Sequence, residues 1–497
     1  MEQKIRELMN LKESYKIELK EAENDLPKSF WETYSAFSNT EGGTIYLGIK
    51  ENKKGKNNIL GVKNCEKIIK ALWDNLSNTN KVNYRNINNE DVKILDAEEK
   101  KIIVIHVNEA PNNRKPVYIN GNIKFTYIRT GDGDRLAKES EIKALISNSS
   151  NSIDSELLNN FYISDLDDET IQAYKEKVDR REKRFGYLKL SNEEFLEKIG
   201  VIRIDRKDGK KKITTGGLLF FGKYFSIKDK YLNYHLDYFN RKGNSNRWKD
   251  RVASDEFPLR EMNLYNFYII VSEKLFLTVE TAFELDKNKE RLNMNDLQDS
   301  LREALVNCLV HADYSLPFPT VKIEVHDGWT SFSNPGKMLI SKEEFIRGGI
   351  SQPRNEILMS LFRKMGISER QGWGGLQIYQ SAIKNRCRTP ELETDLEKTF
   401  IRIWNIDLVD SHPELTENEK IVFKLIVKNK AGMKKSEVME KGRLSVYKVS
   451  QALKSLKEKE LISVYGKGKS TQYSVKFGSE EHKIQIKFLM EELLSTL

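Results

Sequence analysis

Three glutamates near the N-terminus have the residue type and spacing for metal-dependent chemistry. Glu18 and Lys20 share one face of a predicted strand, Glu13 precedes it, and Glu51 follows the next predicted strand. A β-α-β path would let the three carboxylates converge, and they cannot all stay ionised at one place without a cation. Mg²⁺ or Mn²⁺ suits such oxygen ligands and can drive phosphodiester hydrolysis. The alternative is that these side chains are solvated charges on an exposed strand.

A second set of polar residues recurs along a helix predicted over residues 297–312. Glu303, Asn307 and His311 stand four residues apart, so they share one helix face, while leucines and valines cover the opposite side. Buried polar groups need hydrogen-bonding partners. A nucleotide with its Mg²⁺ would supply them, and so would a buried hydrogen-bond network between helices.

Two glycine-containing segments follow this helix in the chain. They contribute Asn334 and Gly336, and then Gly372, Gly374 and Gly375. The second segment precedes a predicted helix, and glycines at a helix start let backbone N–H groups approach phosphates. A glycine-rich loop without a ligand is the alternative for such a segment taken alone.

The C-terminal part of the chain is locally basic. Residues 414–475 hold fourteen Lys and Arg against seven Glu and no Asp. Helices predicted over 417–427, 435–440 and 445–458, followed by two short strands, give the plan of a winged helix-turn-helix. Nucleic-acid contacts are then expected from Tyr447, Lys448, Gln451, Lys454, Lys467 and Lys469. The alternative is a winged helix that serves dimerisation or packing and carries solvated lysines.

The remaining patterns predict a multidomain α/β (α+β) protein of four parts. A helix over 26–37 and strands over 44–49, 101–107 and 123–129 indicate a mixed α/β domain. A strand hairpin is expected over 321–332, turning at Asp327-Gly328. The expected parts are a nucleic-acid domain at 1–147, a linker and mixed middle region at 148–290, a nucleotide-binding core at 291–406, and the winged helix with a C-terminal packing helix at 411–497.

The N-terminal pattern resembles the Schlafen AlbA-like domain. The motif Glu13-x4-Glu18-x-Lys20, the glycine segment ending in Gly48-Ile49 and the segment Tyr127-x-Arg129-x-Gly131 agree with that family in order and spacing. The resemblance implies a metal site at Glu13, Glu18 and Glu51 that cleaves RNA, with Glu51 standing where the family usually has Asp. In DNA-binding relatives Lys20, Arg129 and Arg135 would contact phosphates instead.

The central pattern resembles the N-box of GHKL-type ATPases, in the branch labelled RecG-like or Schlafen-associated. The resemblance implies an α/β sandwich that binds ATP, in which Glu303 activates water and Asn307 binds Mg²⁺. Asn334 takes the place of the Asp that reads adenine. The RecG label does not imply a helicase, because the chain has no Gly-x4-Gly-Lys-Ser/Thr loop.

Composition agrees with these expectations. The chain of 497 residues has a formal net charge of +9, which favours anionic partners, and its three cysteines have no metal-ligand spacing. We therefore expect a cytoplasmic protein without a membrane segment. Its expected partners are ATP with Mg²⁺ or Mn²⁺ and RNA or DNA, and it could form a homo-oligomer.

Three functions compete on this basis. The first is an ATP-responsive, metal-dependent endonuclease that acts on RNA in bacterial defence or stress. The second is a non-catalytic, DNA-binding transcriptional regulator with ATP as ligand. The third is a toxin-like protein whose partner is another protein.

Overall fold

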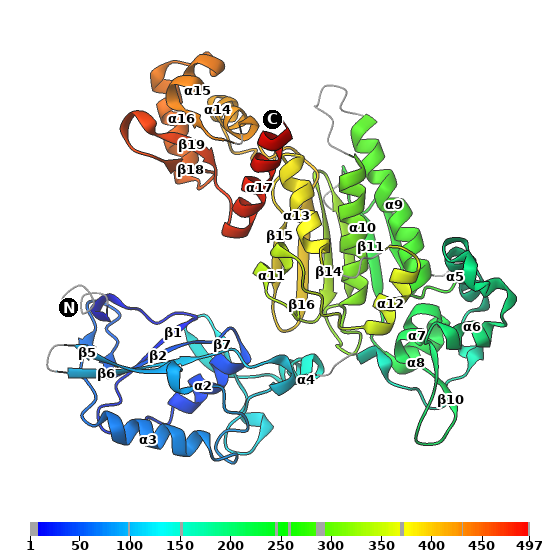
Figure 1. Ribbon diagram of the computed structural model, residues 1–497, viewed down its shortest axis with the longest axis horizontal. Helices are drawn as coiled ribbons and strands as arrows, with labels where there is room; N and C mark the ends of the chain where they lie inside the picture. Colours follow the sequence, from blue (N-terminus) through cyan, green and yellow to red (C-terminus); the bar gives the residue numbers. More distant parts are fainter. Residues whose placement is uncertain are drawn as a thin grey trace. The chain divides into compact units, whose positions relative to one another are not determined.

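The computed structural model describes residues 8–97, 100–149, 153–243, 247–256, 260–284, 294–367, 372–429 and 431–495. The chain divides into two compact units, Met1–Asn151 and Ser152–Leu497. Each unit combines helices with β-sheets (Figure 1), which confirms the predicted multidomain α/β class. Among the helices of the described ranges, none has the length and apolarity needed to cross a membrane.

The N-terminal unit is built on a four-stranded sheet with the order β1-β2-β6-β5. The strands are β1 (Ile17–Lys20), β2 (Gly43–Leu47), β5 (Val92–Ala97) and β6 (Lys100–Val107). β1 and β2 run parallel, so the helix between them, α2 (Phe30–Asn39), makes the predicted β-α-β crossover. Phe30, Tyr34 and Phe37 are fully buried, which confirms the predicted apolar face of this helix.

Shorter elements complete the N-terminal unit. They are β3 (Ile49–Lys50) paired with β4 (Asn58–Ile59), α3 (Cys65–Leu76), β7 (Tyr127–Thr130) paired with β8 (Gly133–Leu136), and α4 (Glu139–Ser149). The strand predicted over 123–129 is wrong in its first half, because Ile123–Phe125 forms a 3₁₀ turn. The Asn122 side chain accepts a hydrogen bond from the Lys124 backbone N–H, and this local bond competes with strand pairing.

The second unit begins with a helical region whose centre is aromatic. Its elements are α5 (Asp168–Arg181), α6 (Asn192–Lys198), the hairpin of β9 (Ile202–Ile204) and β10 (Lys211–Ile213), α7 (Thr215–Phe221) and α8 (Tyr224–Lys230). The Tyr174 ring packs edge-on against Phe220 and Phe221, with ring centres 5.3 and 5.1 Å away. These rings belong to the same core as the large sheet that follows, so the two regions pack as one body.

The large sheet has six strands in the order β12-β11-β13-β14-β16-β15. They are β11 (Leu236–Asn240), β12 (Asp250–Ala253), β13 (Val321–His326), β14 (Trp329–Pro335), β15 (Glu391–Thr394) and β16 (Lys398–Trp404). The helices α9 (Leu264–Glu284), α10 (Met294–Val310) and α13 (Gly374–Lys384) lie over this sheet (Figure 1). The predicted hairpin at Asp327-Gly328 is confirmed, and two strands of the sheet come from before residue 291.

The C-terminal part of the second unit contains three helices and a three-stranded sheet. They are α14 (Glu417–Lys428), α15 (Lys435–Gly442) and α16 (Val446–Glu458), with the sheet order β17-β19-β18. The strands are β17 (Met433–Lys434), β18 (Ile462–Tyr465) and β19 (Gln472–Val475). This element order is the one expected of a winged helix-turn-helix, and Val449, Leu453 and Leu456 of α16 are buried in its core as predicted.

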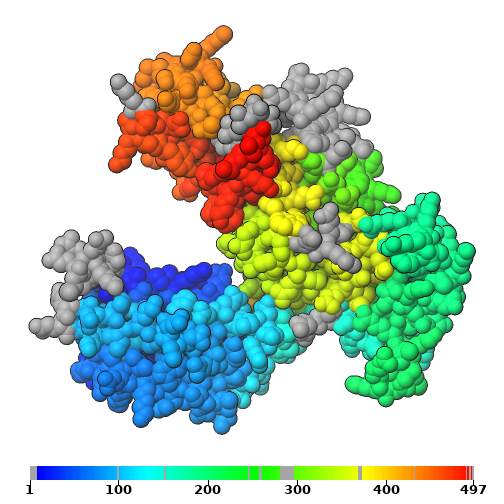
Figure 2. Space-filling view, in the orientation of Figure 1, coloured from blue at the N-terminus to red at the C-terminus, as the bar shows by residue number. Residues whose placement is uncertain are grey.

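The last helix, α17 (Ser479–Ser495), packs against the central part of the same unit. Ile484 is buried in a small apolar cluster with Ile346 of α11 (Lys342–Arg347) and with Tyr379 and Ile383 of α13. In Figure 2 this segment (red) lies directly on the surface formed by those helices. The C-terminal helix therefore packs against the central sheet region, in agreement with its predicted packing role.

Candidate functional site

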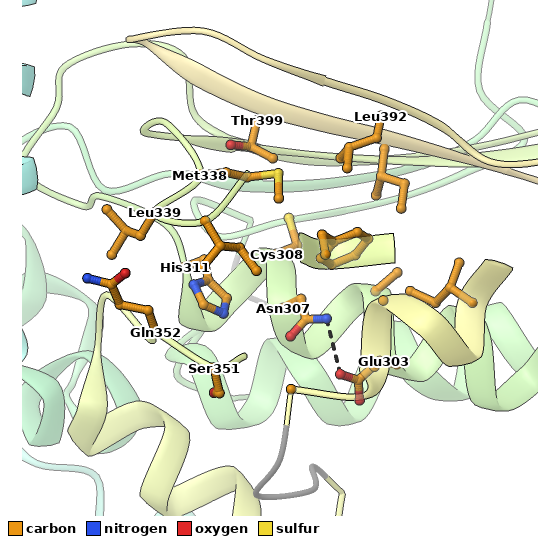
Figure 3. A pocket seen from close by; sticks show the side chains of 18 of the residues that line it. Glu303, Asn307, Cys308, His311, Met338, Leu339, Ser351, Gln352, Leu392 and Thr399 are labelled. Carbon is orange, nitrogen blue, oxygen red and sulfur yellow. Dashed lines mark hydrogen bonds between the residues drawn. The ribbon is translucent and has the colours of Figure 1, made fainter. Parts of the chain in front are cut away.

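A cavity lies between α10, the sheet and the start of α13, and it collects most of the polar residues that the sequence singles out (Figure 3). Glu303, Asn307, His311, Asn334, Gly372, Gly374 and Gly375 line it. Apolar side chains form much of the remaining wall: Met338, Leu339, Ile378, Leu392 and Ile401. A polar stripe beside an apolar wall suits a ligand with a flat apolar part and a charged part.

Glu303 and Asn307 are held together on one face of α10. The Asn307 Nδ2 donates to Glu303 Oε1 at 3.1 Å, as the i, i+4 spacing predicts (Figure 3). The start of α13 lies against the same carboxylate. A Cβ at Gly374 would lie 1.8 Å from Glu303 Oε1, so only glycine allows this approach. The first backbone N–H groups of α13 therefore lie next to the polar end of the cavity.

His311 is half-buried, directly after the end of α10, and lines the cavity. Burial, with the nearby positive charge of Arg354 as a second cause, lowers its pKa to about 4. The imidazole is therefore neutral at physiological pH and can both donate and accept a hydrogen bond inside the cavity.

Arg354 and Asn355 stabilise the C-terminal end of α10. The Asn355 Nδ2 donates to Val310 O and Ala312 O at 2.7 and 2.8 Å, and Arg354 Nε donates to His311 O at 3.0 Å. These carbonyls have no partner within the helix, so the two side chains act as a cap. Both side chains are buried in this cap.

Asn334 and Gly336 differ in their position relative to the cavity. Asn334 lines it, whereas Gly336 lies behind the wall, where a Cβ would meet Arg354 Nη2 at 3.1 Å. Thr399, which the sequence analysis missed, stands opposite Asn334 in the β14–β16 pairing and also lines the cavity. Its hydroxyl donates to Gly336 O at 2.8 Å. The alternation of the 398–404 strand indicates which residues share a face with Thr399, but not that this face lines the cavity.

The residues present fit an adenine nucleotide with its Mg²⁺. Asn307 and Glu303 supply oxygen ligands of the kind that Mg²⁺ uses, and the α13 start suits phosphates. Asn334 and Thr399 could meet the polar edge of a base beside the apolar wall.

The N-terminal carboxylates come near one another but have other partners. The Glu13 backbone N–H donates to Glu51 Oε1 at 3.3 Å, and Glu13 Oε1 accepts from the Leu19 N–H at 3.1 Å. Burial raises the pKa of Glu13, and the neighbouring charges of Glu18 and Glu51 raise it further. In the described ranges no group of three or more His, Cys, Asp or Glu is placed to hold a metal ion.

Glu18 is bound by two cations instead. Arg129 Nη1 donates to Glu18 Oε2 and to Asp134 Oδ1, both at 2.8 Å, and Lys20 Nζ lies 2.8 Å from Glu18 Oε1. Glu13, Glu18 and Glu51 thus lie near one another as expected, but ion pairs already engage the Glu18 carboxylate, and the metal site stays a prediction.

The predicted phosphate contacts of the N-terminal unit are also engaged. The Arg129 side chain is completely buried, so the expectation that it contacts a phosphate is wrong. Lys20 is nearly buried beside Glu18. Arg135 forms two hydrogen bonds with the Glu141 carboxylate, at 2.9 and 2.7 Å. Arg129 and Lys20 are thus enclosed by the unit, whereas Arg135 is paired but 39% exposed.

The third helix, α16, and the segment between β18 and β19 present the predicted contact residues to solvent. Tyr447, Lys448, Gln451, Lys454 and Lys467 are exposed. Gln451 Nε2 donates to the Tyr447 hydroxyl at 2.7 Å, which holds these two side chains side by side. The side chain of Lys469 lies outside the described residues.

Comparisons with known proteins match three parts of the chain. The family models are "Schlafen, AlbA_2" over residues 13–138, "Domain of unknown function (DUF8451)" over 143–237, and "Putative ATP-dependent DNA helicase recG C-terminal" over 319–403. A comparison with curated proteins gives no match.

Two solved structures show weak similarity. The DIP2311 protein from Corynebacterium diphtheriae is 16% identical, over 93% of this chain and 95% of that one, with a TM-score of 0.39. The N-terminal domain of a putative ATP-dependent DNA helicase RecG-related protein from Nitrosomonas europaea is 27% identical, over 27% of this chain and 92% of that one, with a TM-score of 0.21. Such TM-scores do not establish a shared fold. The family models do identify the two domains, and the chain thus carries a Schlafen AlbA_2 domain at residues 13–138 and a recG C-terminal, ATPase-like domain at 319–403, the combination expected of an AlbA-like divergent ATPase.

Proposed function

We propose that this protein binds ATP in the cavity beside α10 and interacts with nucleic acid as a non-catalytic regulator. One observation carries the ATP-binding half of the proposal. The cavity is lined by polar residues that are unusual in a protein core, Glu303, Asn307, His311 and Asn334, together with the start of α13. The ATPase-like family match supports the same ligand.

Within this proposal each cavity residue has a stated role. Asn307 and Glu303 would hold Mg²⁺, and the backbone N–H groups at Gly374 and Gly375 would bind phosphate oxygens. Asn334 and Thr399 bind the edge of the adenine. The neutral His311 hydrogen-bonds the nucleotide without adding charge.

Nucleic-acid interaction is supported by two parts of the chain. The Schlafen AlbA_2 match covers the N-terminal unit, and α16 exposes a row of basic and polar side chains in a basic C-terminal part. The regulator is favoured over the metal-dependent endoribonuclease because Arg129 and Lys20 neutralise Glu18, which leaves no three-carboxylate site in the described structure.

Nucleotide titration tests the ATP site. Full-length protein is titrated with ATP and Mg²⁺ by calorimetry, beside Asn307→Ala and a matched control, Asn405→Ala, at an asparagine outside the cavity lining. We expect Asn307→Ala to weaken binding about tenfold or more, since a charge-assisted contact contributes about 1.5–3 kcal/mol. No binding by the unchanged protein would refute the ATP site.

An RNA cleavage assay tests the choice between regulator and nuclease. Labelled RNA and duplex DNA are incubated with the protein, Mn²⁺ or Mg²⁺, with and without ATP, beside Glu13→Ala/Glu18→Ala. We expect binding without cleavage. Cleavage that disappears in the double variant would establish the endonuclease instead.

A further inference from the structure

A loop of the N-terminal unit places cations over aromatic rings. The loop covers residues 77–88, between α3 and β5. Lys81 Nζ lies 5.6 Å from the centre of the Trp31 ring of α2. The guanidinium carbon of Arg85 lies 5.1 Å from the centre of the Trp73 ring of α3. Two cations of one loop thus cover rings on two different helices.

A third pair continues this arrangement. The guanidinium carbon of Arg114 lies 5.7 Å from the centre of the Tyr84 ring, and Tyr84 is the sequence neighbour of Arg85. Arg85 and Arg114 are both exposed. The six residues that we call the loop patch are Trp31, Trp73, Lys81, Tyr84, Arg85 and Arg114.

The cations of the loop patch are not neutralised by carboxylates. Across the ranges that the structure describes, Lys81, Arg85 and Arg114 form no ion pair, and their polar contacts are neutral. Lys81 Nζ donates to Asn120 Oδ1 and Arg85 Nε donates to Ile87 O, both at 3.3 Å. Other exposed cations of this unit do pair with carboxylates: Lys63 with Glu23, Lys67 with Asp25 and Lys143 with Glu139.

The loop is fixed in place by its own hydrogen bonds. Asn83 Nδ2 donates to Pro116 O at 3.0 Å, and Asn83 Oδ1 accepts from the Tyr118 N–H at 2.7 Å. The Asn86 N–H donates to the Tyr34 hydroxyl at 2.6 Å. A loop held this way loses little conformational entropy when a ligand binds.

We propose that the loop patch binds a single-stranded segment of nucleic acid. Lys81 and the edges of the two guanidinium groups bind phosphates, and bases stack on the guanidinium planes and on the partly exposed rings of Trp73 and Tyr84. The proposal rests on the nucleic-acid interaction proposed above. It assigns that interaction to residues outside the carboxylate cluster and outside α16.

Single-stranded nucleic acid fits these groups better than a duplex. Unpaired bases expose their faces to planar side chains, whereas a duplex hides those faces and offers mainly its phosphates. Three cations without an ion pair, together with the two partly exposed rings of Trp73 and Tyr84, therefore favour a ligand that is both anionic and aromatic; Trp31 is buried in the core and only supports Lys81.

Binding of labelled single-stranded RNA, single-stranded DNA and duplex DNA to the full-length protein tests the proposal. The variant Lys81→Gln/Arg85→Gln/Arg114→Gln is compared with Lys63→Gln/Lys67→Gln/Lys143→Gln, which removes the same charge from paired cations. We expect the loop-patch variant to bind single strands about tenfold or more weakly. The slope of log binding constant against log salt concentration should become smaller in magnitude by about two. The control should bind within about twofold of the unchanged protein.

A second variant separates stacking from charge. Arg85→Lys/Arg114→Lys keeps both charges but removes the guanidinium planes. We expect it to retain the salt dependence and still lose several-fold affinity for single strands. If this variant binds single strands as tightly as the unchanged protein, the patch binds by charge alone and the stacking proposal is wrong.

The remaining outcomes are also decisive. If the unchanged protein binds nucleic acid and the loop-patch triple variant, folded by circular dichroism, binds equally well, the proposal is wrong and the proposed function stands. If the unchanged protein binds no nucleic acid at low salt, both the loop-patch proposal and the nucleic-acid part of the proposed function are wrong. A preference for duplex DNA over both single strands would also overturn the proposal, and the two single-stranded probes distinguish RNA from DNA.

Discussion

The two polar clusters predicted from sequence end in opposite environments. Glu303, Asn307 and His311 line a cavity, whereas Glu18 of the N-terminal cluster is enclosed by Arg129 and Lys20. Glu303, Asn307 and His311 recur every four residues on a helix, and Glu18 and Lys20 alternate on a strand. Spacing determines which side chains share a face of a helix or strand, but the groups packed against that face decide whether a ligand can reach them.

The electrostatics of the two clusters differ in the same way. Burial shifts the pKa of His311 down and that of Glu13 up, so each group is pushed towards its neutral form. His311 is then a neutral ligand-facing group. Glu13 carries the repulsion of Glu18 and Glu51, which no described metal site relieves.

The largest expected effect is the loss of the buried cation of the N-terminal cluster. Arg129→Ala leaves Glu18 and Asp134 without their shared partner, and breaking a buried ion pair costs about 3–5 kcal/mol. We expect the free energy of unfolding of the N-terminal unit to fall by that amount. Hydrogen exchange of the β1 and β7 segments, measured on the full-length protein, checks it.

Arg135→Ala is the matched control for Arg129→Ala. Arg135 also pairs with a carboxylate, that of Glu141, which is only 8% exposed, but the Arg135 side chain itself is 39% exposed, so we expect a smaller loss than for Arg129→Ala. Equal effects of the two substitutions would contradict the structural role given to Arg129. If Arg129→Ala instead left stability unchanged and weakened nucleic-acid binding, the phosphate-contact expectation would be restored.

Sequence reasoning succeeded where one element determined the outcome. The Glu303–Asn307–His311 stripe, the hairpin at Asp327-Gly328 and the buried face of α16 each depend on local periodicity, and the structure confirms the placement of each. It failed where the outcome depends on distant segments. Arg129 is 111 residues from Glu18, and Asn355 is 45 residues from the carbonyl that it caps.

Local competition explains the other errors. The 123–129 stretch alternates like a strand, but Asn122 stabilises a 3₁₀ turn at its start. Thr399 was missed because its role depends on the β14–β16 register, which brings it opposite Asn334. The residue pattern of one strand does not predict this register, because the packing of the whole sheet determines it.

A pH dependence of the second unit is the next largest effect. His311 has a folded-state pKa of about 4 against an ordinary value of 6.5, so the unfolded chain binds more protons between these pH values. The contribution of His311 to the free energy of unfolding is therefore fully present above pH 6.5. It is lost as the pH falls towards 4, by on the order of 3 kcal/mol. Denaturant unfolding of the protein and of His311→Gln from pH 7 to pH 4 measures the difference.

The difference between the protein and His311→Gln is the informative quantity. We expect it to shrink on acidification, because only the unsubstituted protein must protonate an imidazole whose pKa is lowered by folding. A difference that stays constant with pH would show that His311 titrates normally, and the cavity would then be open to water at this position.

The smallest expected effect concerns Glu13, and its sign is opposite. Its folded-state pKa is raised above 4.5 by burial and by Glu18 and Glu51, so the folded protein binds more protons than the unfolded chain. This contribution to stability is fully present below pH 4.5 and is lost as the pH rises through the raised pKa. Glu13→Gln, which removes the charge, is therefore expected to stabilise the N-terminal unit slightly at pH 7 and not at pH 4, as measured by hydrogen exchange of the β1 segment. Because a divalent cation would reverse the repulsion, stabilisation of the unsubstituted protein by Mn²⁺ that Glu13→Gln abolishes would contradict this account and return the metal centre to the N-terminal cluster.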